Sequence, residues 1–183
     1  MVTDRSLHRH TVADGFLRRH LPHGSGVVID VGASENHEYE DNYRATFKSF
    51  GYEYKPGYLV EGWDLAQRQG CKYTGIFCSH VLEHIPNDEI AAKYLWSMAG
   101  SFLVVVLPIA DEHIEYGEAR QEEWGHVRRY SIERVLSLFP DLPDACEVED
   151  VISFLPSGES CPFDNWQIEC LWVKEEDRCH SRD

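Results

Sequence analysis

Val27-Val28-Ile29-Asp30-Val31-Gly32-Ala33-Ser34 is an apolar run that meets an acid and then a glycine. Short, continuous apolar runs of this kind are typical of a strand that is buried on both faces of a parallel sheet. Gly32 lets the backbone approach a ligand closely because it has no Cβ. In open parallel sheets, ligands bind outside the carboxyl ends of the strands, near the switch point. The stretch therefore predicts a buried first strand that leads into a ligand-binding turn, with an ordinary tight turn as the alternative.

Predicted strands and helices alternate along the rest of the chain. Apolar runs bounded by turn signals predict strands at 27–31, 51–54, 73–79, 102–107, 146–154 and 166–174. Helical spacing and capping residues predict helices at 5–21, 43–50, 88–98 and 131–139. Such alternation indicates a mostly parallel sheet, and the last two strands, with no helix between them, add an antiparallel pair. The predicted fold class is α/β: a doubly wound, mostly parallel sheet with an antiparallel C-terminal hairpin edge.

Two prolines are expected to end structural elements. Pro56, with Gly57, is expected to form a turn, and Pro108 is expected to end the strand at 102–107. No repeat and no linker divides the sequence, which predicts one domain over residues 1–183. Within it we expect an N-terminal helix at 1–24, a core at 25–140 and C-terminal strands at 141–174.

Composition excludes several classes of partner. A net charge of −15 and a pI near 5.0 disfavour nucleic acid and anionic lipid. The longest apolar run, Phe102–Ala110, is about half of what a membrane helix needs, so no membrane partner is expected. The six cysteines form no CxxC pair, which argues against a zinc ribbon or a redox motif and favours reduced thiols. The polar N-terminus lacks the apolar run of a signal peptide, and this predicts a cytoplasmic protein.

A second acidic residue follows the first strand at a sequence spacing that is typical of a ribose-binding acid. Glu53 lies 23 residues after Asp30 and is expected at the end of the second strand. An acid about 20 residues past the first loop is well placed to accept hydrogen bonds from ribose hydroxyls. Glu53 is therefore a candidate ligand for a nucleoside cofactor.

Two further segments resemble a known family. Phe77–Pro86 (FCSHVLEHIP) resembles the fourth-strand motif of class I S-adenosylmethionine-dependent methyltransferases. Glu123–Ser131 (EWGHVRRYS) is similar to a loop after the fifth strand in the small-molecule members of that family. On this resemblance, Asp30–Ser34 takes the place of the family's first motif, and Trp63–Leu65 resembles its adenine-contacting segment. The resemblance covers roughly residues 25–140 and implies a Rossmann-like fold.

The resemblance implies S-adenosylmethionine as the cofactor. Together with Glu53, which the spacing places on the second strand, three of the four matching segments supply the expected cofactor-binding residues: Asp30, Gly32, Ser34, Glu53, Trp63, Asp64, Ser79 and His80. The first motif departs from the family pattern of three alternating glycines, because only Gly32 remains and Ser34 and Asn36 take the other two places.

The expected reaction is transfer of a methyl group to oxygen or nitrogen of a small-molecule or sugar-like acceptor. A hydroxyl acceptor needs a base, and histidine suits that role because it is neutral near pH 7. His126 is predicted as the acceptor-side base or orienter, and His80 as a catalytic residue beside the cofactor; either could instead be structural. A structural or capping role is favoured for His84, and Arg128 could either clamp an anionic substrate or form a surface salt bridge with Glu122 or Glu133.

Of three other hypotheses, one remains open as an alternative and two are disfavoured. A methyltransferase-like binding or regulatory subunit without catalysis is the alternative, since the glycine motif is reduced and the chain is small. A dinucleotide oxidoreductase is disfavoured because the first turn lacks Gly-x-Gly-x-x-Gly and Glu35 would repel a pyrophosphate. No metal is expected, because His80 and His84 do not follow the His-Glu-x-x-His order. The histidines at 8, 10 and 20 are expected to be solvated, and a homodimer is left open.

Overall fold

The computed structural model describes residues 4–33, 38–57, 72–109, 128, 130–150 and 166–174. Its elements in chain order are α1 (Asp4–His20), β1 (Gly26–Val31), α2 (Glu38–Ser49), β2 (Tyr52–Gly57), β3 (Tyr73–Ser79), the 3₁₀ turn η2 (Leu82–His84), α3 (Asp88–Met98), β4 (Ala99–Ile109), α5 (Ile132–Ser137), β5 (Ala145–Asp150) and β6 (Trp166–Val173). No helix among these residues is long and apolar enough to cross a membrane.

The strands form one mixed sheet in the order β2-β1-β3-β4-β6-β5. The pairs β1–β2, β1–β3 and β3–β4 are parallel, whereas β6 runs antiparallel to both β4 and β5. After β1 the chain adds β2 on one side and then returns to add β3 on the other side. The topological switch point therefore lies between β1 and β3, where open α/β sheets bind their ligands.

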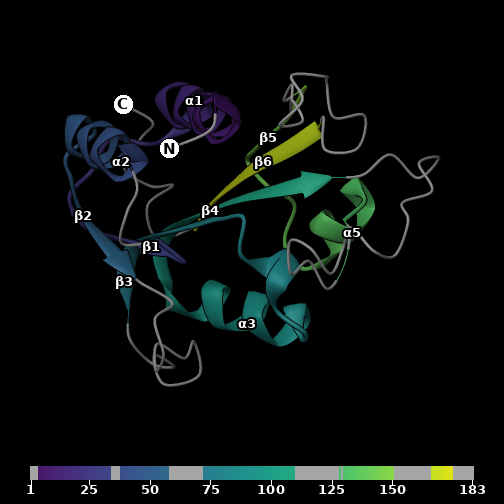
Figure 1. Cartoon of the computed structure of the whole chain (residues 1–183). Helices are drawn as coiled ribbons and strands as arrows, with labels where there is room; N and C mark the ends of the chain where they lie inside the picture. Colours follow the sequence, from purple (N-terminus) through teal and green to yellow (C-terminus); the bar gives the residue numbers. More distant parts are fainter. Residues whose placement is uncertain are drawn as a thin grey trace.

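Helices cover both faces of the sheet (Figure 1). On one face, α1 and α2 bury Phe16, Leu17, Tyr43 and Phe47 against the sheet. On the other face, the apolar sides of α3 and α5 pack against alternate residues of the same strands. Because successive strand residues point to opposite faces, continuous apolar runs such as 102–107 supply both cores. The predicted fold class, doubly wound and mostly parallel with an antiparallel C-terminal pair, is confirmed.

Side-chain caps fix the starts of two helices where the sequence predicts them. The Asn87 side chain accepts a hydrogen bond from the Ile90 backbone N–H at 3.1 Å and caps α3. The Ser131 hydroxyl accepts one from the Arg134 backbone N–H at 3.2 Å and caps α5. Such caps satisfy backbone donors that have no partner within the helix. The predicted starts of these two helices are confirmed.

The two prolines do not end their strands, and both predictions were wrong for the same reason. Pro56 lies inside β2, which has only β1 as a neighbour in the described sheet. Pro108 lies beyond Val106, the last β4 residue that pairs with β3, and its own sheet partner is Gln167 of β6; the next residue, Ile109, bridges Tyr130. A proline lacks the N–H donor, and a strand tolerates it where one side of the strand needs no partner.

Candidate functional site

Both strands at the switch point end in a left-handed backbone turn. Gly32 follows β1 with φ 87°, and its N–H donates to the Gly57 carbonyl at 3.0 Å. His80 follows β3 with φ 54°, and its N–H donates to the Val106 carbonyl at 2.9 Å. Glycine adopts this conformation freely, whereas a residue with a Cβ pays roughly 1–2 kcal/mol. Strain of this kind gathers at functional sites, and here it lies at the expected ligand edge.

The His80 side chain is held at both ring nitrogens. Nε2 lies 3.0 Å from Oε1 of Gln167 on β6, and Nδ1 lies 3.3 Å from Oε1 of Glu83 in η2. The Gln167 amide nitrogen donates to Glu169 and to the Arg9 carbonyl, which leaves its oxygen facing His80. Both ring nitrogens thus face side-chain oxygen atoms of the protein, which fixes the orientation of the ring. This geometry suits a positioning residue better than an open base.

Two buried carboxyl groups flank the His80 ring. Burial would raise the pKa of Glu83, which is 1% exposed, but the interactions with His80, its own backbone and His84 together hold that pKa below its usual value. Glu169 is fully buried beside the same network, and burial raises its pKa to about 7. Within the described part of the chain, Oε2 of Glu169 has no hydrogen-bond partner. The carboxyl end of the sheet therefore carries the Glu83 carboxylate, whose pKa is lowered, and the Glu169 carboxyl group, whose pKa is raised to about 7.

A second polar group links the edge to the helices above it. The hydroxyl of Tyr43 on α2 lies 2.6 Å from Nδ1 of His10 on α1; burial raises the pKa of Tyr43, and the Ser79 side chain at the end of β3 acts in the opposite direction. The His10 ring stacks on Tyr39, with 3.8 Å between ring centroids. The prediction that His10 is solvated was therefore wrong. His20 is part-buried, with 30% of its side chain exposed, and its Nε2 contacts Glu147 at 2.5 Å.

Asp30 lies beneath α2, two residues before Gly32. Its Oδ2 accepts a hydrogen bond from the Tyr54 hydroxyl at 2.5 Å. Burial raises the pKa of Asp30 to about 7, although the bond from Tyr54 acts in the opposite direction. Asp30 thus supports the first turn from within the sheet.

Glu53 lies away from this edge. It pairs with Val27 at the start of β1, its side chain is exposed, and its Oε1 lies 3.2 Å from Nζ of Lys55. Because β2 continues to Gly57, Glu53 is about 13 Å from the carboxyl end of the strand. The expectation that Glu53 ends the second strand was wrong, since it placed the turn at Pro56-Gly57. Glu53 plays no part in the site that we propose.

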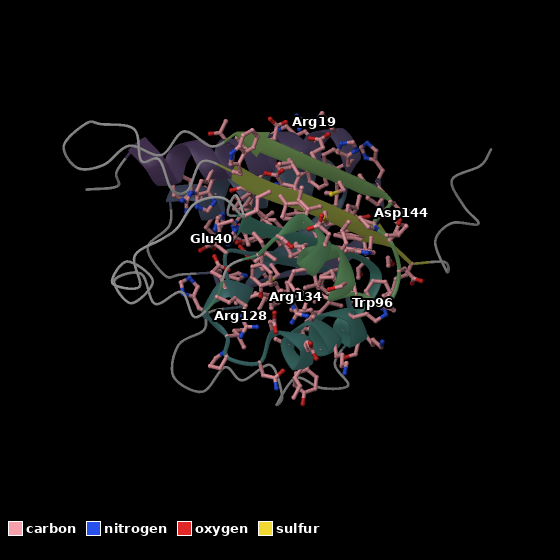
Figure 2. The ribbon with its side chains drawn as sticks, turned by 90° about the vertical axis from the view of Figure 1, so that its right-hand side faces the viewer. Arg19, Glu40, Trp96, Arg128, Arg134 and Asp144 are labelled. Carbon is pink, nitrogen blue, oxygen red and sulfur yellow. The ribbon has the colours of Figure 1, made fainter. Side chains whose placement is uncertain are left out.

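Arg128 is engaged by protein groups. Its guanidinium pairs with Asp88 and donates to the Pro86 carbonyl, and Arg134 contacts the same Asp88 carboxylate at 3.0 Å (Figure 2). Of the two roles open for Arg128, an ion pair is observed, but its partner is the buried Asp88 and not the predicted Glu133, while Glu122 lies outside the described residues. His84 is 41% exposed and lies 3.9 Å from Glu83. The predicted residues Ser34, Trp63, Asp64 and His126 lie outside the described residues.

The sequence analysis missed four residues of this site: His10, Tyr43, Gln167 and Glu169. The signal for the last two was present in β6, where Gln167 and Glu169 alternate with apolar residues and so share one face. Nothing local showed that α1 covers this face, because the contact joins residues 158 positions apart.

An open pocket of about 530 Å³ lies elsewhere, lined by residues that include Trp96, Trp172 and Asp144. In Figure 2, Trp96 and Asp144 lie at the right of the molecule, whereas Glu40, near the start of α2, lies at the left. β6 reaches this pocket at Val173, which pairs with Phe102 near the start of β4. The pocket is thus at the opposite edge from the switch-point turns.

No known protein family matches the sequence, and a search of curated proteins found no match. Solved structures do resemble the fold. An S-adenosylmethionine-dependent methyltransferase from Archaeoglobus fulgidus has a TM-score of 0.57 at 14% identity, covering 90% of this chain and 94% of that chain. One from Anabaena variabilis has a TM-score of 0.54 at 15% identity, covering 91% and 84%.

Phosphoethanolamine N-methyltransferase 2 from Haemonchus contortus, solved with S-adenosylmethionine, has a TM-score of 0.62 at 10% identity, covering 89% of this chain and 51% of that chain. Sequence identities this low support similarity of fold alone. The mixed sheet and the two helical layers of this chain are consistent with that fold. The chain has the fold of the S-adenosylmethionine-dependent methyltransferases.

Proposed function

We propose that this protein transfers a methyl group from S-adenosylmethionine to oxygen or nitrogen of a small-molecule or sugar-like acceptor. The observation that carries the proposal is the pair of left-handed turns at Gly32 and His80, which flank the switch point of a methyltransferase fold. We place the reaction in the cytoplasm and propose no nucleic-acid or membrane partner.

The chemistry of the edge fits this cofactor. S-adenosylmethionine carries a positive sulfonium and an amino group; the edge offers the Ser79 hydroxyl, and the buried carboxyl groups of Glu83 and Glu169 lie beneath it. Gly32 and Ser79 are the described residues that would hold it, with Asp30 supporting the turn from below. Ser34, Trp63 and Asp64 are proposed as further ligands from the sequence resemblance.

When bound, the cofactor supplies an electrophilic methyl group. The chain's own residues then serve mainly to position the reactants, which contributes a large part of the rate in displacements of this kind. His80 is suited to that role, because Glu83 and Gln167 fix its ring and the backbone bond to Val106 fixes its turn. A hydroxyl acceptor also needs a proton acceptor, and His126 is proposed for that step.

Calorimetric titration with S-adenosylmethionine and S-adenosylhomocysteine tests the proposal. We expect micromolar binding by the wild type and at least about tenfold weaker binding by Gly32→Val, because valine is strained at this backbone angle and narrows the turn. Ser79→Ala is a milder second variant. Glu53→Ala is the matched control: it removes an acid from the opposite end of β2 and should bind as the wild type does.

Circular dichroism and thermal melting establish that each variant is folded. Equal weakening by Glu53→Ala and Gly32→Val would show that the ligand does not lie at the switch point. If the folded wild type releases no heat and shows no thermal shift at millimolar ligand, the enzyme proposal is wrong. A methyltransferase-like scaffold would then be the remaining interpretation.

A further inference from the structure

We propose that Cys146 and Cys170 are a redox modification site: a thiol pair that closes reversibly into a cross-strand disulfide when it meets a low-molecular-weight disulfide such as oxidised glutathione. The site uses no residue of the switch-point edge, and it does not depend on the proposed methyl transfer.

The two cysteines are aligned for a bond. Cys146 on β5 stands directly opposite Cys170 on β6 in the antiparallel register. Directly opposed residues of an antiparallel pair have Cα atoms about 4.5 or 5.5 Å apart, and both separations lie within the range that a disulfide spans. The two sulfur atoms are already 3.3 Å apart. Closure therefore needs only side-chain adjustment.

The pair is asymmetric in exposure and in charge. Cys146 is exposed, whereas Cys170 is buried in the core beneath it. The Cys170 thiol donates a hydrogen bond to the Cys146 sulfur and lowers the pKa of Cys146, while the same contact and burial raise the pKa of Cys170. A thiolate is the reactive form of cysteine, so Cys146 is the attacking sulfur and Cys170 the resolving one.

The exchange balances in two steps. The Cys146 thiolate attacks one sulfur of oxidised glutathione, the glutathione S–S bond breaks, and one glutathione thiolate leaves. Cys170, losing its proton, then attacks the Cys146 sulfur of the mixed disulfide and releases the second glutathione. The two protein thiols are oxidised, and one glutathione disulfide is reduced to two thiols. Excess reduced glutathione reverses both steps.

The bond would fasten a strand that otherwise borders only one neighbour. β5 pairs with β6 alone among the described strands, and the two cysteines are 24 positions apart in sequence. Next to Cys146, the Glu147 side chain pairs with Arg19 and His20 at the end of α1. Closing a loop of this length constrains the unfolded chain, so the oxidised protein should melt about 5–10 °C above the reduced one.

Peptide mapping after equilibration in glutathione buffers tests the proposal. In oxidising buffer we expect a wild-type fragment that joins Cys146 to Cys170, lost again in reducing buffer. In Cys170→Ala the resolving sulfur is missing, so glutathione should remain attached at Cys146. In Cys146→Ser neither product should form at these two positions. Cys78, which is buried, is the internal control and should stay unmodified in the folded protein.

The melting temperature gives a readout that does not rely on fragments. Oxidation should raise it in the wild type and leave it unchanged in Cys146→Ser, an exposed substitution that should preserve the fold. The proposal is overturned if both thiols remain fully alkylatable in oxidising buffer. It is equally overturned if Cys146 of the wild type accumulates glutathione as Cys170→Ala does, or if Cys146 bonds a different cysteine.

Discussion

At the scale of single residues, the site depends on polar groups that the fold buries. Gln167 spans from His80 to Glu169, and the Tyr43 hydroxyl bonds the His10 ring, so these polar groups find partners on other elements or strand positions. Buried polar groups are costly without such partners. Sequence spacing correctly indicated that Gly32 and His80 follow the ends of two strands, β1 and β3. It could not show the ring contacts of His80, because Gln167 lies 87 residues away.

Asp30 gives a prediction about pH. Its folded pKa of about 7 lies above the ordinary value of 3.8, so between these values the folded protein holds a proton that the unfolded chain has released. Stability from Asp30 is therefore complete below pH 4 and is lost as the pH rises towards 7. Urea unfolding from pH 5 to 8 should show the wild type losing on the order of 2–4 kcal/mol more than Asp30→Asn. Parallel curves for the two proteins would refute the assignment.

At the scale of elements, capping and strand signals were strong where they were local. The bounds Tyr73–Ser79 for β3 and the end of α3 at Met98 agree with the sequence prediction. β2 and β4 continue past their predicted ends at residues 54 and 107. A strand tolerates proline where one of its sides has no partner, and the sheet order decides which sides are paired. The start of α2 at Glu38 was placed too late, since its first turn carries few apolar residues.

The first turn of α3 offers a matched pair of substitutions. The Asp88 carboxylate is 5% exposed and contacts both Arg128 and Arg134, whereas Glu89 is 62% exposed and contacts Arg134 alone. Asp88→Ala should lower the free energy of unfolding by about 3 kcal/mol, because it leaves two guanidinium groups without their shared anion. Glu89→Ala should cost less than about 0.5 kcal/mol. Chemical denaturation of both variants checks the difference, and equal losses would contradict it.

At the scale of the whole molecule, the fold separates two edges of one sheet. The carboxyl edge carries the turns at Gly32 and His80 with the buried polar groups beneath them, and the opposite edge carries the open pocket at Trp96 and Asp144. Alternating periodicity sufficed to predict the layers and the mixed sheet. The sequence pattern does not show where a ligand would bind. The strand order places the switch point between β1 and β3, and this locates the expected ligand site.

The most direct measurement is a titration of isotopically labelled protein with S-adenosylhomocysteine, followed by amide chemical shifts. The account predicts saturable shifts centred on Gly32, Ala33, Ser79 and His80, with little change at Trp96. Shifts that gather around Trp96 instead, or no saturable shifts at millimolar ligand, would contradict a cofactor site at the switch point.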